Sequence, residues 1–107
     1  MSAYDLFRFA EGQFAERDYL GAAQALERLI AEHTDEPDLN SARELLTRSY
    51  FHSAQLRKAE AAARDLLDRD PTHAYAALLL ARALERQSRP EEADAARRLA
   101  DALGAPA

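Results

Sequence analysis

Residues 40–71 read NSARELLTRSYFHSAQLRKAEAAARDLLDRDP, and this stretch decides the fold. Apolar or small side chains recur in it at i, i+3, i+4 and i+7, which is the spacing of a helix with one buried face. The pattern breaks once near Ser53 and ends at Asp70 and Pro71, because a residue that precedes proline is biased away from helical geometry. The stretch therefore predicts two antiparallel helices joined by a short turn.

The same spacing covers the rest of the chain and predicts an all-α protein. Of 107 residues, 48% are apolar and only 3 are Gly and 4 are Pro, so helix formers dominate. We expect six helices, of which the third reaches about Ser53, the fourth runs from near Gln55 to Arg69, and the last stops at Gly104. The expected N-terminal caps are Ser2, Asp18, Asp38 or the Ser41–Glu44 pair, Thr72 or His73, and the Ser88–Glu91 pair with Pro90 in the first turn.

The three predicted hairpins repeat one unit. Ala93 follows Ala59 by 34 residues, and Pro71 follows Pro37 by the same distance. Ala59 follows Ala22 by 37 residues, so three extra residues sit in the polar run before Pro37, where a surface connection tolerates insertion. A repeated helical hairpin buries its apolar stripe by stacking on its neighbours.

A helix–turn–helix period of 34 residues resembles the tetratricopeptide repeat family. In the middle unit, Leu46, Tyr50 and Ala59 stand where that family has its leucine, tyrosine and small residue, and Pro71 matches its terminal proline. The departures are Arg43 and Thr47, at the places of the family's tryptophan and glycine. The resemblance implies one domain over residues 1–107, an α-solenoid of three hairpins in a right-handed superhelix, with units at about 3–37, 38–71 and 72–105.

The resemblance also implies a non-enzymatic interaction module whose first, third and fifth helices line a concave groove for a protein or peptide partner. The groove residues expected on this basis are Arg48, Phe51, His52, Tyr75, Leu79, Arg82 and Arg86. Guanidinium groups among aromatic and apolar side chains suit an acidic or amphipathic segment. An alternative is that Arg48 and Arg82 pair with the neighbouring acids Glu44 and Glu85 and face only water. The subclass that captures chaperone C-terminal carboxylates uses Lys and Asn at groove positions that here hold other residues, namely Leu45, Arg48, Tyr75 and Leu79.

The sequence predicts no catalytic, metal or cofactor site. His33, His52 and His73 lie in separate segments without metal-ligand spacing, and the three glycines are isolated. The net charge of −5 argues against nucleic acid and anionic membrane surfaces as partners. Cysteine is absent, which excludes disulfides and leaves the redox compartment undetermined. No signal segment or long apolar run is present, so we expect a cytoplasmic protein.

A second hypothesis is a structural protomer that self-assembles through its terminal helices. The predicted last helix carries Ala93, Ala96, Ala100 and Leu103 among charged residues, and the sequence given ends shortly after it. Either this helix is polar enough to serve as its own cap, or its apolar strip is covered by a partner or a second copy in a homodimer.

Overall fold

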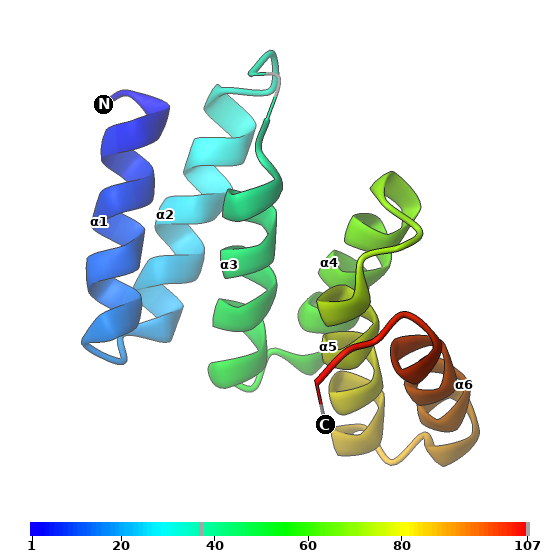
Figure 1. Ribbon diagram of the computed structural model, residues 1–107. Coiled ribbons are helices and arrows are strands. Elements are labelled where there is room, and N and C mark those ends of the chain that lie inside the picture. The colour runs from blue at the N-terminus through cyan, green and yellow to red at the C-terminus, as the bar shows by residue number, and fades with distance from the viewer. Residues whose placement is uncertain (37, 107) are drawn as a thin grey trace.

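The computed structural model describes residues 1–36 and 38–106, which form six α-helices and no strand (Figure 1). Pro37, which the sequence predicts as the end of the first unit, lies outside these residues. The helices are α1 (Ala3–Ala15), α2 (Tyr19–Glu32), α3 (Asn40–His52), α4 (Leu56–Arg69), α5 (Ala74–Arg86) and α6 (Pro90–Ala102). The prediction of an all-α chain with six helices is confirmed.

Three of the expected N-terminal caps form as side-chain hydrogen bonds. The Ser2 hydroxyl accepts from the Asp5 N–H at 3.1 Å, and the Asp18 carboxylate accepts from the Gly21 N–H at 3.0 Å. The His73 Nδ1 accepts from the Ala76 N–H at 3.1 Å. Each cap satisfies a backbone donor that the first helical turn leaves without an intrahelical acceptor.

Both predicted capping boxes are wrong. Helix α3 begins after Leu39 without a side-chain cap, while the nearby Asp38 carboxylate accepts from the Asn40 N–H at 3.1 Å. Helix α6 begins after Arg89, and Ser88 stands one residue too early, at φ 58° in the turn. The hairpin turn uses Ser88 as its left-handed residue, so that residue is not the cap.

The turn inside each hairpin has the same geometry three times. Arg17, Ala54 and Ser88 are its left-handed residues, with φ of 65°, 60° and 58°. The N–H of the following residue donates five positions back to a carbonyl: Asp18 to Gln13, Gln55 to Tyr50, and Arg89 to Leu84. This is the closing bond of a Schellman motif. The same pattern ends α6, where Gly104 has φ 83° and the Ala105 N–H donates to the Ala100 carbonyl.

Helices pack in chain order, each against the next. Helix α3 also touches α1 and α5, whereas no helix of the first hairpin packs against one of the third among the described residues. The described chain measures 42 × 27 × 21 Å. No helix in it has the length and apolar character needed to cross a membrane.

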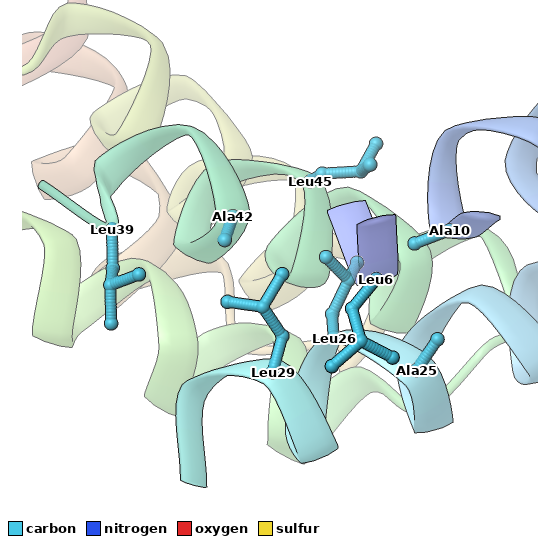
Figure 2. Close-up of a cluster of buried hydrophobic side chains, with 8 residues drawn as sticks. All are labelled: Leu6, Ala10, Ala25, Leu26, Leu29, Leu39, Ala42 and Leu45. Atoms are coloured by element: carbon cyan, nitrogen blue, oxygen red, sulfur yellow. The ribbon is translucent and has the colours of Figure 1, made fainter. Parts of the chain in front are cut away.

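The core is a series of small clusters between neighbouring hairpins. The first cluster joins α1, α2 and α3 (Figure 2), and its buried members are Leu6, Ala10, Ala25, Leu26, Leu29, Leu39, Ala42 and Leu45. A second joins α2, α3, α4 and α5 through Ala23, Tyr50, Ala59 and Ala83. Alanine at these contacts lets helix backbones approach closely, which is why an alanine-rich chain packs this way.

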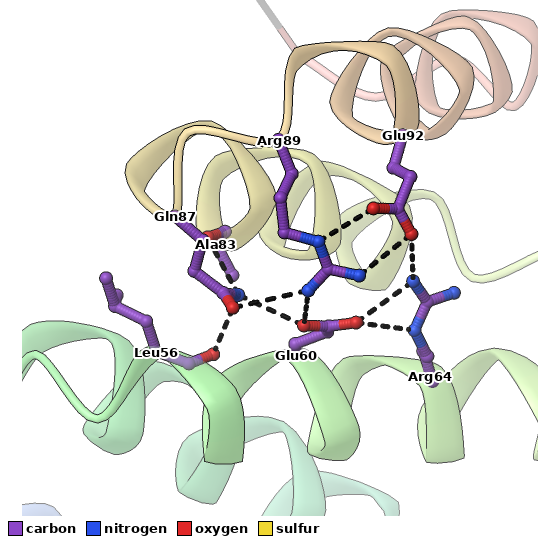
Figure 3. Close-up of polar contacts among 7 residues, drawn as sticks. All are labelled: Leu56, Glu60, Arg64, Ala83, Gln87, Arg89 and Glu92. Atoms are coloured by element: carbon purple, nitrogen blue, oxygen red, sulfur yellow. Dashed lines mark hydrogen bonds and ion pairs between the residues drawn. The ribbon is translucent and has the colours of Figure 1, made fainter.

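A polar network ties the start of α4 to the turn between α5 and α6 (Figure 3). The Glu60 carboxylate accepts from Arg89 at 2.5 Å and from Gln87 at 3.1 Å. Arg89 also pairs with Glu92 at 2.7 Å, and Arg64 pairs with Glu60 at 3.1 Å. Burial alone would raise the pKa of Glu60, but the hydrogen bonds from Gln87, Arg89 and Arg64 lower it below its ordinary value.

Candidate functional site

Four aromatic rings meet where α1, α2 and α3 have neighbouring ends. Phe14 near the end of α1 meets Tyr19, the first residue of α2, edge-to-face with centroids 5.0 Å apart. His52 at the end of α3 stacks on Tyr19 at 4.9 Å and meets Phe14 and Phe51 edge-to-face at 5.6 Å. The hairpin turn brings Phe14 and Tyr19 together, and the packing of α3 adds the other two rings.

Two arginines lie on these rings. The Arg48 guanidinium is 4.7 Å from the centroid of Phe14, and the Arg86 guanidinium on α5 is 5.2 Å from that of Phe51. Both distances are within the range of a cation–π contact. We call this set the aromatic–arginine surface; it consists of Phe14, Tyr19, Arg48, Phe51, His52 and Arg86.

The three arginines expected in the groove have no carboxylate partner in the described part of the chain. Among residues 1–36 and 38–106, Arg48, Arg82 and Arg86 form no ion pair. The Arg48 Nε is buried and has no hydrogen-bond partner in that part of the chain. A buried donor without an acceptor is costly, so a ligand oxygen that reached it would be favoured.

The nearby acids are engaged elsewhere. Glu44 lies 3.7 Å from the His73 Nε2, and Glu85 pairs with Arg97 on α6. The alternative in which Glu44 and Glu85 neutralise Arg48 and Arg82 is therefore not what the structure shows. The positive charge of these arginines is left for solvent or a ligand.

His52 is held neutral by its surroundings. Burial among the rings lowers its pKa below 6.5, and the positive charges of Arg48 and Arg86 lower it further. The imidazole therefore acts at neutral pH as a flat, uncharged surface between two cations. A negative ligand group placed there would reverse part of this effect.

The structure brings together four of the seven residues expected in the groove: Arg48, Phe51, His52 and Arg86. Arg82 is half-buried on α5. Tyr75 packs instead against the buried cluster of Ala77, Leu78 and Ala100, which joins α5 to α6. Leu79 is only 3% exposed, so its side chain is covered.

Phe14 and Tyr19 were missed as site residues by sequence reasoning. Each falls on the apolar stripe of its own helix, and both are half-buried, so periodicity assigns them to the core. A usable signal was their position on either side of the Arg17 turn, which places two rings at one end of a hairpin.

The described residues contain no group of three or more His, Asp or Glu side chains placed to hold a metal ion. The three histidines have separate positions: His33 caps the C-terminal end of α2, His73 caps the start of α5, and His52 lies in the aromatic–arginine surface.

A scan against models of protein families finds no match to this chain, and a search of curated proteins finds no similar sequence.

Proposed function

We propose that this chain is a three-unit helical repeat of the tetratricopeptide type that acts as a non-enzymatic binding module. Its ligand is an acidic or amphipathic peptide segment of a partner protein, bound on the face formed by α1, α3 and α5. The observation that carries the proposal is the aromatic–arginine surface, where Arg48 and Arg86, which pair with no carboxylate among the described residues, lie on aromatic rings.

The chemistry of this surface suits a carboxylate. An arginine that stacks on a ring keeps the N–H donors at its edge available, and these match the two oxygens of a carboxylate. Arg48 and Arg86 lie on α3 and α5, so acids spaced along one peptide would reach both. Phe51 and Tyr19 would contact its apolar side chains.

The repeat architecture supports the proposal independently. The left-handed residues Arg17, Ala54 and Ser88 recur at the 37- and 34-residue spacings of the sequence pattern, each with the same closing hydrogen bond. Within the described residues, the first and third hairpins both pack on the second and not on each other. A stack of this kind leaves one long face of first helices open along the row.

The test is affinity capture from the native host, followed by binding measurements with the captured partner. We expect the double variant Arg82→Glu and Arg86→Glu to lose the partner without changing its oligomer size in light scattering. Each lost charge-assisted hydrogen bond costs about 1.5–3 kcal/mol, so affinity should fall at least roughly tenfold.

The matched control is Arg57→Glu with Arg98→Glu, which makes the same change of charge at exposed positions on α4 and α6. Equal loss of binding in this control and in the groove variant would mean that only net charge matters. Capture of a partner that the groove variant still binds with full affinity would contradict the proposal.

A second candidate is self-association through the terminal helices. Its support lies in the first hairpin, where Phe9 on α1 is 54% exposed and Leu20 on α2 is 55% exposed. On α6, Leu99 is 39% exposed among charged neighbours. A clean monomer in light scattering would remove this candidate, whereas a dimer that Phe9→Ser and Leu20→Ser dissociate would support it.

A further inference from the structure

A pocket of about 390 Å³ opens between α2 and α4, with α3 as its floor. Helix α3 lies between these two helices in Figure 1. The apolar part of the lining comes from Ile30 on α2, Leu46 and Tyr50 on α3, and Ala61 and Ala62 on α4. We call it the α2–α4 pocket.

The α2–α4 pocket and the aromatic–arginine surface lie on opposite sides of α3. With 3.6 residues per turn, Leu46 and Tyr50 fall on one side of the helix, and Arg48 and His52 fall on the other. The structure agrees, since Leu46 and Tyr50 line the pocket whereas His52 stacks on Tyr19. A ligand in the pocket would therefore leave the aromatic–arginine surface open.

The rim of the pocket is basic although the chain as a whole is acidic. Arg43, Lys58 and Arg69 line it together with one carboxylate, that of Asp65. The Asp65 carboxylate already forms two ion pairs, because it lies 3.0 Å from Arg69 and 3.8 Å from Arg43. Lys58 pairs with no acid among the described residues, and its Nζ is 5.7 Å from the centroid of Tyr50.

A second acid, Glu27, lies near the pocket beside Tyr50. Burial raises the pKa of Tyr50, and the adjacent Glu27 raises it further, so the hydroxyl stays protonated beside that carboxylate. The lining holds three basic side chains and one carboxylate, so its excess charge is positive.

We propose that the α2–α4 pocket is a second docking site, which binds an acidic helical segment through one large apolar anchor residue. The anchor would fill the space over Leu46 and Tyr50, and carboxylates one turn to either side of it would pair with Lys58 and Arg69. The apolar lining favours such a peptide over a nucleic acid, whose phosphates would leave Ile30 and Leu46 without a partner. The chain would then hold two partners at once, one on each side of α3.

The variant that tests the site is Lys58→Glu with Ala61→Glu. Ala61 lines the pocket and is exposed on α4, and glutamate is a good helix former, so the fold should survive. The matched control is Arg98→Glu with Ala95→Glu on α6, which changes the same charges at the same spacing on an exposed helix face. Circular dichroism melts would verify that both variants fold.

The experiment selects peptides from a random display library on the unmodified chain after depletion of the library on the Lys58→Glu and Ala61→Glu variant. We expect the retained peptides to carry Asp or Glu around one large apolar residue. They should bind the unmodified chain and the control equally, and should bind the pocket variant at least ~10-fold more weakly. They should bind the Arg82→Glu and Arg86→Glu variant without loss, which separates this site from the proposed groove.

The proposal is overturned if no peptide survives the depletion, or if the survivors are neutral or basic. It is also overturned if their binding depends on Arg82 and Arg86. A second binding experiment uses a fluorescein-labelled thymidine oligonucleotide in place of the peptides. If its binding depends on Lys58 and Ala61 in the same way, the pocket is assigned to nucleic acid instead.

Discussion

His52 should make the stability of the chain depend on pH. Its pKa is lowered by burial and by Arg48 and Arg86, so the unfolded chain binds a proton at His52 more readily than the folded chain does. Stability from this group is therefore complete above the unfolded value of 6.5 and is lost as the pH falls through the lowered folded value.

We expect His52→Gln to remove this part of the pH dependence. The free energy of unfolding of the unmodified chain should decline as the pH falls from about 7 to 5, and the variant should decline less over that interval. Urea denaturation at a series of pH values measures both slopes. Identical slopes for the two proteins would mean that His52 is not held between the two arginines.

Arg48 is the residue whose side chain combines burial, charge and ring contact. Its Nε lies buried with no hydrogen-bond partner among residues 1–36 and 38–106, and its guanidinium lies 4.7 Å from the Phe14 centroid. Lysine keeps the charge but has neither the planar group nor several fixed donors. We expect Arg48→Lys to weaken the affinity for the captured partner roughly tenfold, or about 1.4 kcal/mol. Arg98→Lys should leave that affinity unchanged. Isothermal titration calorimetry measures this, and equal affinities for both variants would exclude a bidentate role for Arg48.

The turn inside each helical hairpin recurs with a left-handed residue at the same position. Ala54 has φ 60°, a left-handed conformation that costs a residue with a side chain about 1–2 kcal/mol. Glycine avoids that cost but loses about 0.5–1 kcal/mol more backbone entropy on folding. We expect Ala54→Gly to stabilise the chain by about 0.5–1 kcal/mol, as measured by urea denaturation. Gly104→Ala, at φ 83°, should have the opposite sign, and two changes of the same sign would contradict this explanation.

The Glu60 network joins two elements and should control part of the acid stability. The folded pKa of Glu60 is lowered, so its contribution is present above the unfolded value and is lost as the pH falls through the folded value. Glu60→Gln removes the charge that Arg89 and Arg64 contact (Figure 3), at a cost of about 1–3 kcal/mol near neutral pH. In denaturation curves the difference from the unmodified chain should shrink below about pH 4. A constant difference would contradict the assignment.

Periodicity predicted the helices, their number and the caps at Ser2 and Asp18, because these depend on residues within a turn or two of each other. The Ser41–Glu44 box failed because Ser41 lies inside α3, and the Ser88–Glu91 box failed because Ser88 takes the left-handed position of the turn. Periodicity assigned Phe14 and Tyr19 to the core. It could not show that their rings contact His52, because His52 lies far away in sequence, at the end of another helix. Contacts between helix ends depend on how hairpins pack, and helix periodicity carries no information about that.

One small buried cluster connects all three hairpins of the molecule. Ala23 comes from the first, Tyr50 and Ala59 from the second, and Ala83 from the third. The outer hairpins do not touch among the described residues, so the stability of one can affect the other only through the middle hairpin. A defect at this cluster should therefore unfold the whole chain cooperatively, whereas a defect at α6 should loosen mainly that end.

Ala59→Arg is the sharpest test of this organisation. Ala59 is 1% exposed, so arginine there would bury a charge without a partner, at a cost of several kcal/mol. A domain of this size has about 5–15 kcal/mol of stability in all, so we expect the variant to be unfolded or to melt far below the unmodified chain. Ala61→Arg, two residues along α4 at an exposed position, should fold normally because its side chain reaches water. Circular dichroism melts decide between these outcomes: if Ala59→Arg melts cooperatively within a few degrees of the unmodified chain, Ala59 does not hold the three hairpins together.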